Sequence, residues 1–184
     1  MAATPLKIAI LGGGPSGLYL AMLLKRREPA LQVTVYEQNR AQDTFGFGVV
    51  LADTGLNKLE EADAESVAAM RAVMNFSFQQ TIRLNDDSLD VKRPGAGGGA
   101  ITRIELLRLL QDRCLSAGVD VRFSTRVDPD DTAFAKELAL ADLVVGADGV
   151  NSILRTRMAT EFGTTQRHLN NRFAWYGTHK LFAN

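Results

Sequence analysis

The sequence predicts an α/β fold built on a parallel sheet, with an antiparallel sheet inserted into the chain. Three observations lead to this prediction. A nearly continuous apolar segment, residues 6–11, runs into a glycine-rich turn at 12–17. A second strand-like segment, 32–37, follows after one helix length. Between residues 75 and 91 apolar and polar residues alternate, as they do in antiparallel strands that leave one face in water.

The start of the chain predicts a βαβ unit. The apolar run at 6–11 is typical of a central parallel strand that is buried on both faces. Residues 18–24 are apolar on almost every side, basic residues occupy 25–27, and Pro29 stops the helix. A strand at 32–37 then completes a Rossmann-like unit of about 30 residues.

The next stretch carries the insertion. Residues 44–51 are apolar and punctuated by glycine without a helical period, and short helical stretches are predicted at 54–61 and 64–72. A strand at 75–84, a turn at 85–87 and a second strand after it predict a hairpin. Because antiparallel strands can leave one face wet, we expect this hairpin to belong to a different layer or lobe.

The second half of the chain returns to the parallel sheet. Residues 94–100 contain four glycines and are expected to form a flexible crossing. Thr102 and Glu105 form a capping box that starts a helix, and Gly118 ends it. The remaining predicted elements are strands at 119–123 and 143–145, a short helix at 152–158 and an aromatic, strand-like segment at 172–182.

The glycine turn carries the strongest functional signal. Gly12, Gly14 and Gly17 follow a strand and open a helix, and Glu37 ends the second strand twenty residues after Gly17. This is the full dinucleotide-binding fingerprint, in which the glycines allow a tight turn, a close pyrophosphate and close helix packing. Glu37 would accept hydrogen bonds from an adenosine ribose. The alternative is a glycine-rich turn that binds nothing.

Two weaker signals come later. Arg103 stands at the start of a helix, where a cation is disfavoured unless an anion lies nearby; a cofactor phosphate would supply one, and a surface pair with Glu105 is the alternative. Asp148 and Gly149 follow a buried strand. They form either a ligand-binding turn or a plain one.

Composition excludes several classes of protein. Lys plus Arg and Asp plus Glu both number 21, so no net field attracts nucleic acid or anionic lipid. One cysteine and two histidines exclude a disulfide framework and argue against a metal site. The start of the chain lacks a signal-peptide pattern and no apolar run is long enough to span a membrane, so we expect a cytoplasmic protein.

No side chain predicts a self-sufficient catalytic site. Neither histidine has a neighbour that suggests a triad, and Cys114 falls on the apolar face of its helix. The sequence therefore names no catalytic residue, and a cofactor would have to carry any chemistry.

Taken together, these motifs resemble the FAD-dependent aromatic hydroxylases of the p-hydroxybenzoate hydroxylase-like group. The resemblance rests on GGGPSG at 12–17, Glu37, ITRIELLRLLQ at 101–111 and GADGVNSILR at 146–155. Two further segments, DTFGFGVVLAD at 43–53 and NRFAWYGTHKLF at 171–182, resemble the branch that contains salicylyl-CoA 5-hydroxylase and 2-aminobenzoyl-CoA monooxygenase.

The resemblance implies FAD as the cofactor and NADH or NADPH as a transient reductant, with dioxygen and a small aromatic substrate, such as an aromatic acyl-CoA or a tryptophan-derived indole. It implies that Glu37 holds the ribose, Val127 flanks the adenine and Arg103 lies near the phosphate and ribityl groups. The other implied cofactor residues are Gly12, Gly14, Pro15, Ser16 and Gly17 at the pyrophosphate, Gly46, Gly48 and Val49 near the flavin, and Asp148 and Gly149, which would serve both FAD and the transiently bound nicotinamide cofactor.

The resemblance also divides the chain. Residues 1–73 and 98–165 would form an incomplete FAD-binding domain, and 74–97 with 166–184 would form part of a substrate-domain sheet. A later Gly-Asp motif of this family is missing, so we expect a truncated chain that holds FAD loosely or not at all and does not hydroxylate alone. A non-catalytic dinucleotide-binding module and an NAD-dependent dehydrogenase remain the alternatives; the oligomeric state stays open.

Overall fold

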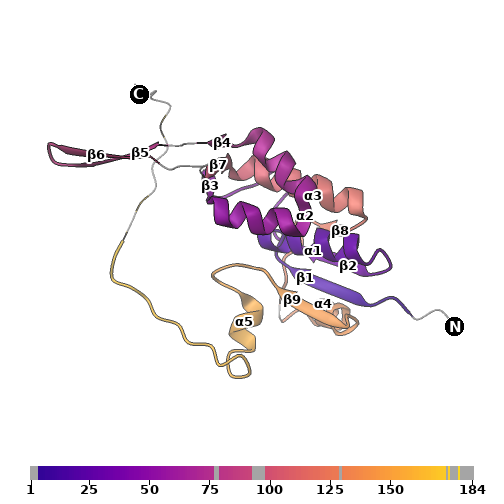
Figure 1. Ribbon diagram of the computed structural model, residues 1–184. Helices are drawn as coiled ribbons and strands as arrows, with labels where there is room; N and C mark the ends of the chain where they lie inside the picture. Colours follow the sequence, from indigo (N-terminus) through magenta and orange to yellow (C-terminus); the bar gives the residue numbers. More distant parts are fainter. Residues whose placement is uncertain are drawn as a thin grey trace.

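The computed structural model describes residues 4–76, 79–92, 98–128, 130–172, 174 and 178. Its centre is a four-stranded parallel sheet in the order β8-β2-β1-β9 (Figure 1). The strands are β1 (Lys7–Leu11), β2 (Gln32–Tyr36), β8 (Asp120–Arg122) and β9 (Leu143–Gly146). In register, Ile10 lies between Val35 of β2 and Val145 of β9, so the most apolar strand is central. The predicted parallel sheet is confirmed.

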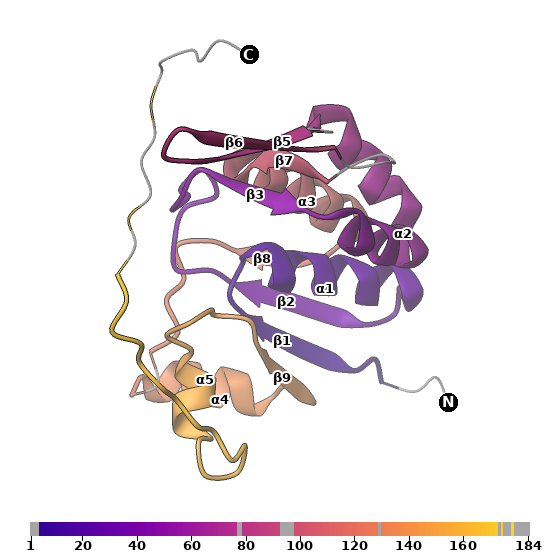
Figure 2. The ribbon, with the colours of Figure 1, turned by 60° about the vertical axis from the view of Figure 1, so that its left-hand side comes forward.

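Helices α1 (Pro15–Arg27) and α3 (Arg103–Ala117) cover one face of this sheet (Figure 2). Thr102 is confirmed as the N-cap, since the Glu105 amide donates to Thr102 Oγ1 at 3.3 Å, while the Glu105 carboxylate accepts from the Thr102 hydroxyl; Gly118 ends α3 with a left-handed φ of 81°. Fully buried residues of β1, α1 and α3, among them Ile10, Leu18 and Leu110, form the main core.

Helix α2 (Asp53–Val73) packs beside α3 and is kinked at Asp63, whose φ of −158° and ψ of 89° are not helical. The kink falls between the two short helical stretches that the sequence predicts. Asp63 is buried and contacts Arg26 of α1 and Arg113 of α3. This carboxylate therefore joins three helices.

A three-stranded antiparallel sheet, β3-β7-β4, lies beyond α1 and was not predicted. Its strands are β3 (Gly48–Leu51), β7 (Gly99–Thr102) and β4 (Asn75–Phe76). The predicted flexible crossing is thus wrong at Gly99 and Ala100, which pair with β3 and β4. A Cβ at Gly99 would lie 2.7 Å from Met74 Cε, so glycine serves close packing there.

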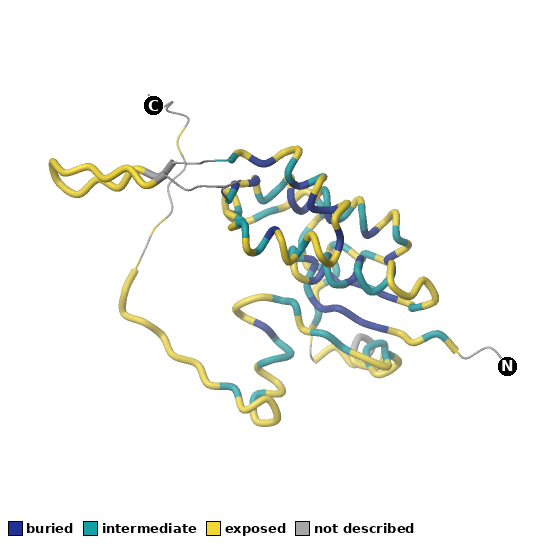
Figure 3. The backbone as a smooth tube through the Cα atoms, in the orientation of Figure 1, coloured by how far each residue is buried: buried dark blue, intermediate teal, exposed yellow. Residues whose placement is uncertain are grey.

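Strands β5 (Gln79–Leu84) and β6 (Asp87–Lys92) form the predicted hairpin, which projects from the body of the molecule (Figure 1). Asn85, with a φ of 54°, and Asp86 make its two-residue turn. Ile82 pairs with Leu89, and both are exposed. Residues 81–91 of the hairpin are exposed throughout (Figure 3).

The opposite face of the parallel sheet carries α4 (Thr132–Ala139), which the sequence did not predict, and α5 (Ile153–Arg157), which it did. A small second core forms there around Ala9, Leu11 and Tyr36. The predicted aromatic strand at 172–182 lies outside the described residues except for 172, 174 and 178, which are in no regular element. Among the helices of the described part, none has the length and apolar character needed to cross a bilayer.

Candidate functional site

A cleft of about 470 Å³ opens where β1, β2 and β9 end. The carboxyl ends of parallel strands are where open α/β sheets bind ligands. Of the residues predicted from the sequence, the cleft is lined by Gly12, Gly14, Glu37, Arg103, Val127, Asp148 and Gly149. These residues come from five separate segments of the chain, and the fold brings them to one place.

The glycine turn shows two different reasons for glycine. Gly12 has a φ of 108°, and a Cβ there would lie 2.4 Å from the Ala147 carbonyl oxygen. A Cβ at Gly17 would lie 2.0 Å from the Gly12 carbonyl oxygen. A Cβ at Gly14, in contrast, would meet nothing within 4 Å. Gly12 and Gly17 are therefore required by the turn itself, whereas the space beside Gly14 is open to a ligand.

Helix α1 begins beside this open space, and no side chain caps the amides of its first turn. Gly14 is its N-cap and supplies no side-chain cap, and the first turn has no acidic residue. Its last turn carries Lys25, Arg26 and Arg27, which complement the negative end of the dipole. The free amides at the start of α1 and the positive end of the dipole can both receive an anionic group.

Glu37 lies directly after β2 and faces the same cleft. Its Oε2 accepts a hydrogen bond from the Gly13 amide at 2.7 Å, and its Oε1 accepts from the Asn39 amide at 2.8 Å and from Asn39 Nδ2 at 2.7 Å. These bonds hold the carboxylate in one orientation against the glycine turn. They place an acidic group next to the start of α1, at the position expected for a ribose acceptor.

Arg103, the first residue of α3, reaches into the cleft from the other side. Its amide donates to the Phe47 carbonyl at 3.1 Å, and its buried Nε has no hydrogen-bond partner within the part of the chain that the structure describes. Among the described residues it forms no ion pair, because Glu105 is bonded to Thr102 instead. The surface-pair alternative for Arg103 is therefore absent from this structure. A buried unpaired guanidinium nitrogen is costly unless a ligand satisfies it.

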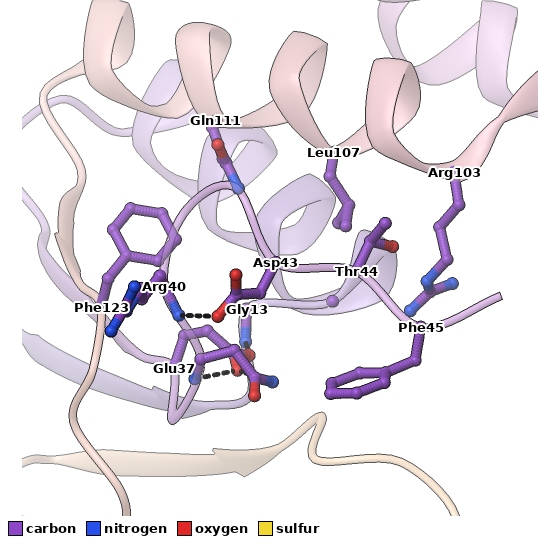
Figure 4. Close-up of a pocket in the computed structure, with 12 residues that line it drawn as sticks. Gly13, Glu37, Arg40, Asp43, Thr44, Phe45, Arg103, Leu107, Gln111 and Phe123 are labelled. Carbon is purple, nitrogen blue, oxygen red and sulfur yellow. Dashed lines mark hydrogen bonds between the residues drawn. The ribbon is translucent and has the colours of Figure 1, made fainter. Parts of the chain in front are cut away.

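A smaller pocket of about 50 Å³ adjoins this side of the cleft (Figure 4). Arg103, Leu107 and Gln111 reach down from α3 toward a loop that carries Asp43, Thr44 and Phe45. Gln111 Nε2 donates to the Ala41 carbonyl at 3.0 Å and so ties the loop to α3. Sequence reasoning missed Thr44, whose buried Oγ1 has no partner, because a lone threonine in a loop carries no motif.

Asp148 uses its two oxygens differently. Oδ2 accepts from the Ile153 amide at 2.7 Å and holds the start of α5, while Oδ1 is buried and without a partner. Gly149, with a φ of 80°, completes the turn, and a Cβ there would meet nothing within 4 Å. The Asp148–Gly149 pair is thus a structural turn and also part of the cleft wall.

Tyr36 lines the cleft as a neutral group. Its hydroxyl donates to Glu137 Oε1 at 2.9 Å. Burial, followed by the hydrogen bond to Glu137, raises the pKa of Tyr36 to about 12. The shift extends the neutral form of the Tyr36 hydroxyl further into the alkaline range.

The remaining predicted residues are not among those that line the cleft. Pro15, Ser16 and Gly17 form the first turn of α1, with Gly17 buried. Gly46, with a φ of 95°, precedes β3, and Gly48 and Val49 belong to that strand. Val49 packs against the main core, so only its backbone could approach a ligand.

Comparison with known proteins gives a family and several relatives. A family described as "FAD binding domain" matches residues 5–179. Salicyloyl-CoA 5-hydroxylase from a Streptomyces species is 40% identical over 96% of this chain and 33% of its own length. A 3-hydroxy-4-methyl-anthranilyl-[aryl-carrier protein] 5-monooxygenase from Streptosporangium sibiricum is 30% identical over 94% of this chain and 46% of its own length.

Among solved structures, the tetrameric form of 2-methyl-3-hydroxypyridine-5-carboxylic acid oxygenase superposes with a TM-score of 0.66 and 24% identity. The match covers 82% of this chain and 41% of that one, and it shows the fold. The chain thus spans between a third and a half of the length of the relatives it matches.

Proposed function

From the premise that the chain belongs to the FAD binding domain family, we propose that it binds FAD in the cleft and serves NAD(P)H-driven hydroxylation of an aromatic ring. The family membership confirms the resemblance drawn from the sequence and the expectation of FAD. It also favours FAD over NAD as the resident cofactor. The reaction, the reductant and the substrate are the parts that we propose.

The unpartnered Nε of Arg103, opposite an uncapped helix start, is the observation that carries this proposal. A pyrophosphate would satisfy both, because it is an anion that can accept hydrogen bonds from two sides. The open space at Gly14 lets the backbone approach it, and Glu37 stands where an adenosine ribose would follow. The residues present therefore fit the ADP half of FAD.

Each predicted residue then has a role that the proposal assigns. Arg103 and the first turn of α1 would hold the phosphates, Glu37 the ribose and Val127 the adenine side. The residues assigned to the pyrophosphate turn are Gly12, Gly14, Pro15, Ser16 and Gly17; those assigned to the flavin side are Gly46, Gly48, Val49, Asp148 and Gly149.

FAD, when bound, supplies the redox chemistry that lets dioxygen deliver one oxygen atom to an electron-rich ring. The side chains described in the cleft bind and orient the cofactor. Phe45, which is 75% exposed, lies beside Arg103 in the smaller pocket. Its ring can exclude water from the cofactor side of the loop.

We propose an aromatic acyl group on a carrier as the substrate class. The name of one relative specifies a salicyloyl group on CoA, and that of another an anthranilyl group on an aryl-carrier protein. Both names therefore specify an aromatic ring attached to a carrier. The two relatives are at least 30% identical to this chain across nearly its whole length.

The test is an assay of the protein as it occurs in its source, loaded with FAD. NADH or NADPH oxidation is followed with salicyloyl-CoA, 2-aminobenzoyl-CoA, the free acids and an indole, and products are identified by mass. We expect an aromatic CoA thioester to stimulate oxidation and to gain one oxygen atom. FAD binding without any hydroxylated product would favour a non-catalytic module. A hydroxylated indole would show that the substrate is an indole and not a carrier-bound aromatic acyl group.

A further inference from the structure

The Glu37 carboxylate is almost fully occupied by donors from its own chain. A carboxylate offers about four acceptor positions, two on each oxygen. Asn39 fills both positions on Oε1 with its backbone amide and its Nδ2, and the Gly13 amide takes one on Oε2. With the donors of the described residues counted, one acceptor position, on Oε2, remains for a ligand.

The backbone of Asn39 is held in place by the neighbouring segment. The Asn39 carbonyl accepts from the Ser124 amide at 2.9 Å, and Ser124 takes a left-handed φ of 52° at this point. On the same side, the Glu37 amide donates to the Arg122 carbonyl at 2.9 Å, and the Glu37 carbonyl accepts from the Thr125 amide at 2.8 Å. Residues 37–39 are thereby bound to residues 122–125 before any ligand arrives.

We infer that Asn39 is a positioning residue: its side-chain amide holds Glu37 Oε1 so that Oε2 presents its single free acceptor position to one ribose hydroxyl. The inference rests on the proposed function, because it takes the cleft to bind an adenine dinucleotide. Asn39 acts through Glu37, and both residues line the cleft.

Neighbouring polar residues do not share this role. Gln38 is exposed, and the Arg40 amide contacts Asp43 rather than Glu37, at 3.3 Å. Of the side chains with described hydrogen bonds to Glu37, that of Asn39 is the one that donates. Loss of this donor would free Oε1 to turn toward the cleft and would let the carboxylate adopt several orientations.

The experiment compares two ligands across four proteins by calorimetric titration. ADP carries the ribose hydroxyls, and 2′,3′-dideoxy-ADP lacks them. The proteins, each made as the protein occurs in its source, are the wild type, Asn39→Ala, Asn39→Asp and, as a control, Asn57→Ala, which changes an exposed asparagine on α2. Asn39→Asp keeps the shape of the side chain and replaces its donor with an acceptor. It therefore shows whether an effect of Asn39→Ala comes from the lost donor or from the lost side-chain volume.

In the wild type we expect ADP to bind roughly tenfold or more tightly than the dideoxy analogue, the effect of one hydrogen bond to a charged group. Asn39→Ala should reduce this preference to about threefold or less, and Asn39→Asp should reduce it at least as far. Asn57→Ala should leave it unchanged. A purely structural role would weaken both ligands equally and preserve the ratio.

A wild-type ratio that persists in both folded Asn39 variants overturns the inference while leaving the proposed function standing. If the wild type bound neither ADP nor FAD, the proposed function would fall, and the inference with it. Thermal melting of each variant shows that the proteins compared are folded.

Discussion

A Cβ atom at Gly17 would lie 2.0 Å from the carbonyl oxygen of Gly12, so the first turn of α1 rests directly on the backbone of the turn that precedes it. Gly14, between them, faces open space. The two positions therefore separate what the fold needs from what a ligand needs.

Replacing Gly17 with Ala should destabilise the protein by about 2–3 kcal/mol or more, because the new methyl group overlaps backbone that cannot move aside.

Replacing Gly14 with Ala should change the free energy of unfolding by less than about 0.5 kcal/mol, since its φ of −73° suits alanine and a lost cap preference is offset in the unfolded chain. The same Gly14→Ala change should strongly weaken FAD binding. Urea unfolding and FAD titration measure both; tight FAD binding by Gly14→Ala would place the pyrophosphate elsewhere.

Arg103→Ala should lower FAD affinity and leave the unliganded fold about as stable as before. The removed cation sits at the positive end of the α3 dipole and has no ion-pair partner among the described residues, so its loss costs nothing or helps slightly. Arg103→Lys serves as the charge-conserving control and should recover part of the affinity. A loss of more than about 1 kcal/mol of stability with FAD binding intact would show that Arg103 is structural.

The parts of the fold that were predicted are those specified by local chemistry. Helix α3 begins after Thr102 and ends at Gly118, as the cap preferences of these residues predict. Asn85 takes the positive φ that a two-residue hairpin turn needs. Helix α4 was missed because it is short and amphipathic. Strands β3 and β7 were missed because they are glycine-rich and pair only with segments distant in sequence.

The residues of the candidate site also fall into those that local sequence predicts and those that it does not. Glu37 and the glycines belong to a spaced motif that can be recognised in the chain. Asn39 and Thr44 lie in a loop, and their importance depends on contacts made after folding, with Glu37 and across from Arg103. Arg103 was predicted because its charge conflicts with its place at a helix start.

Stability should fall in alkaline solution, and Cys114 and Tyr36 should contribute to the fall together with Tyr19, whose pKa burial also raises. Burial raises the pKa of Cys114 from 9.0 to about 12, and burial with the Glu137 hydrogen bond raises that of Tyr36 from 10.0 to about 12. The unfolded chain releases these protons first, so stability is full below about pH 9 and is lost as the pH rises toward 12. Each group contributes a slope of about 1.4 kcal/mol per pH unit.

The measurement is the free energy of unfolding in urea at closely spaced pH values between 8 and 11. Cys114→Ala should remove the slope that begins near pH 9, and Tyr36→Phe should remove part of the additional slope that begins near pH 10, where Tyr19 also contributes. The comparison uses slopes, because either substitution also changes packing. A slope that is the same in wild type and Cys114→Ala would contradict the assignment to that thiol.

The buried carboxylate of Asp63 should matter more than the exposed one beside it. Asp63 contacts Arg26 at 2.7 Å and Arg113 at 3.4 Å with a side chain that is 5% exposed. Asp63→Ala should cost about 2 kcal/mol, because it removes the charge that pairs both arginines at the α2 kink. Glu65→Ala, which removes a carboxylate that pairs with the same arginines in solvent, is the matched control and should have little effect. Equal losses in the two variants would refute this ranking.

The most direct test of the FAD site is a flavin titration of the protein as it occurs in its source with FAD, FMN and ADP. In the proposed site Glu37, Gly14 and Arg103 would contact the ADP half, so FAD should bind at least tenfold more tightly than FMN, and ADP should displace it. Flavin fluorescence reports both. Equal affinity for FMN and FAD, or FAD that ADP cannot displace, would contradict the cofactor site described here.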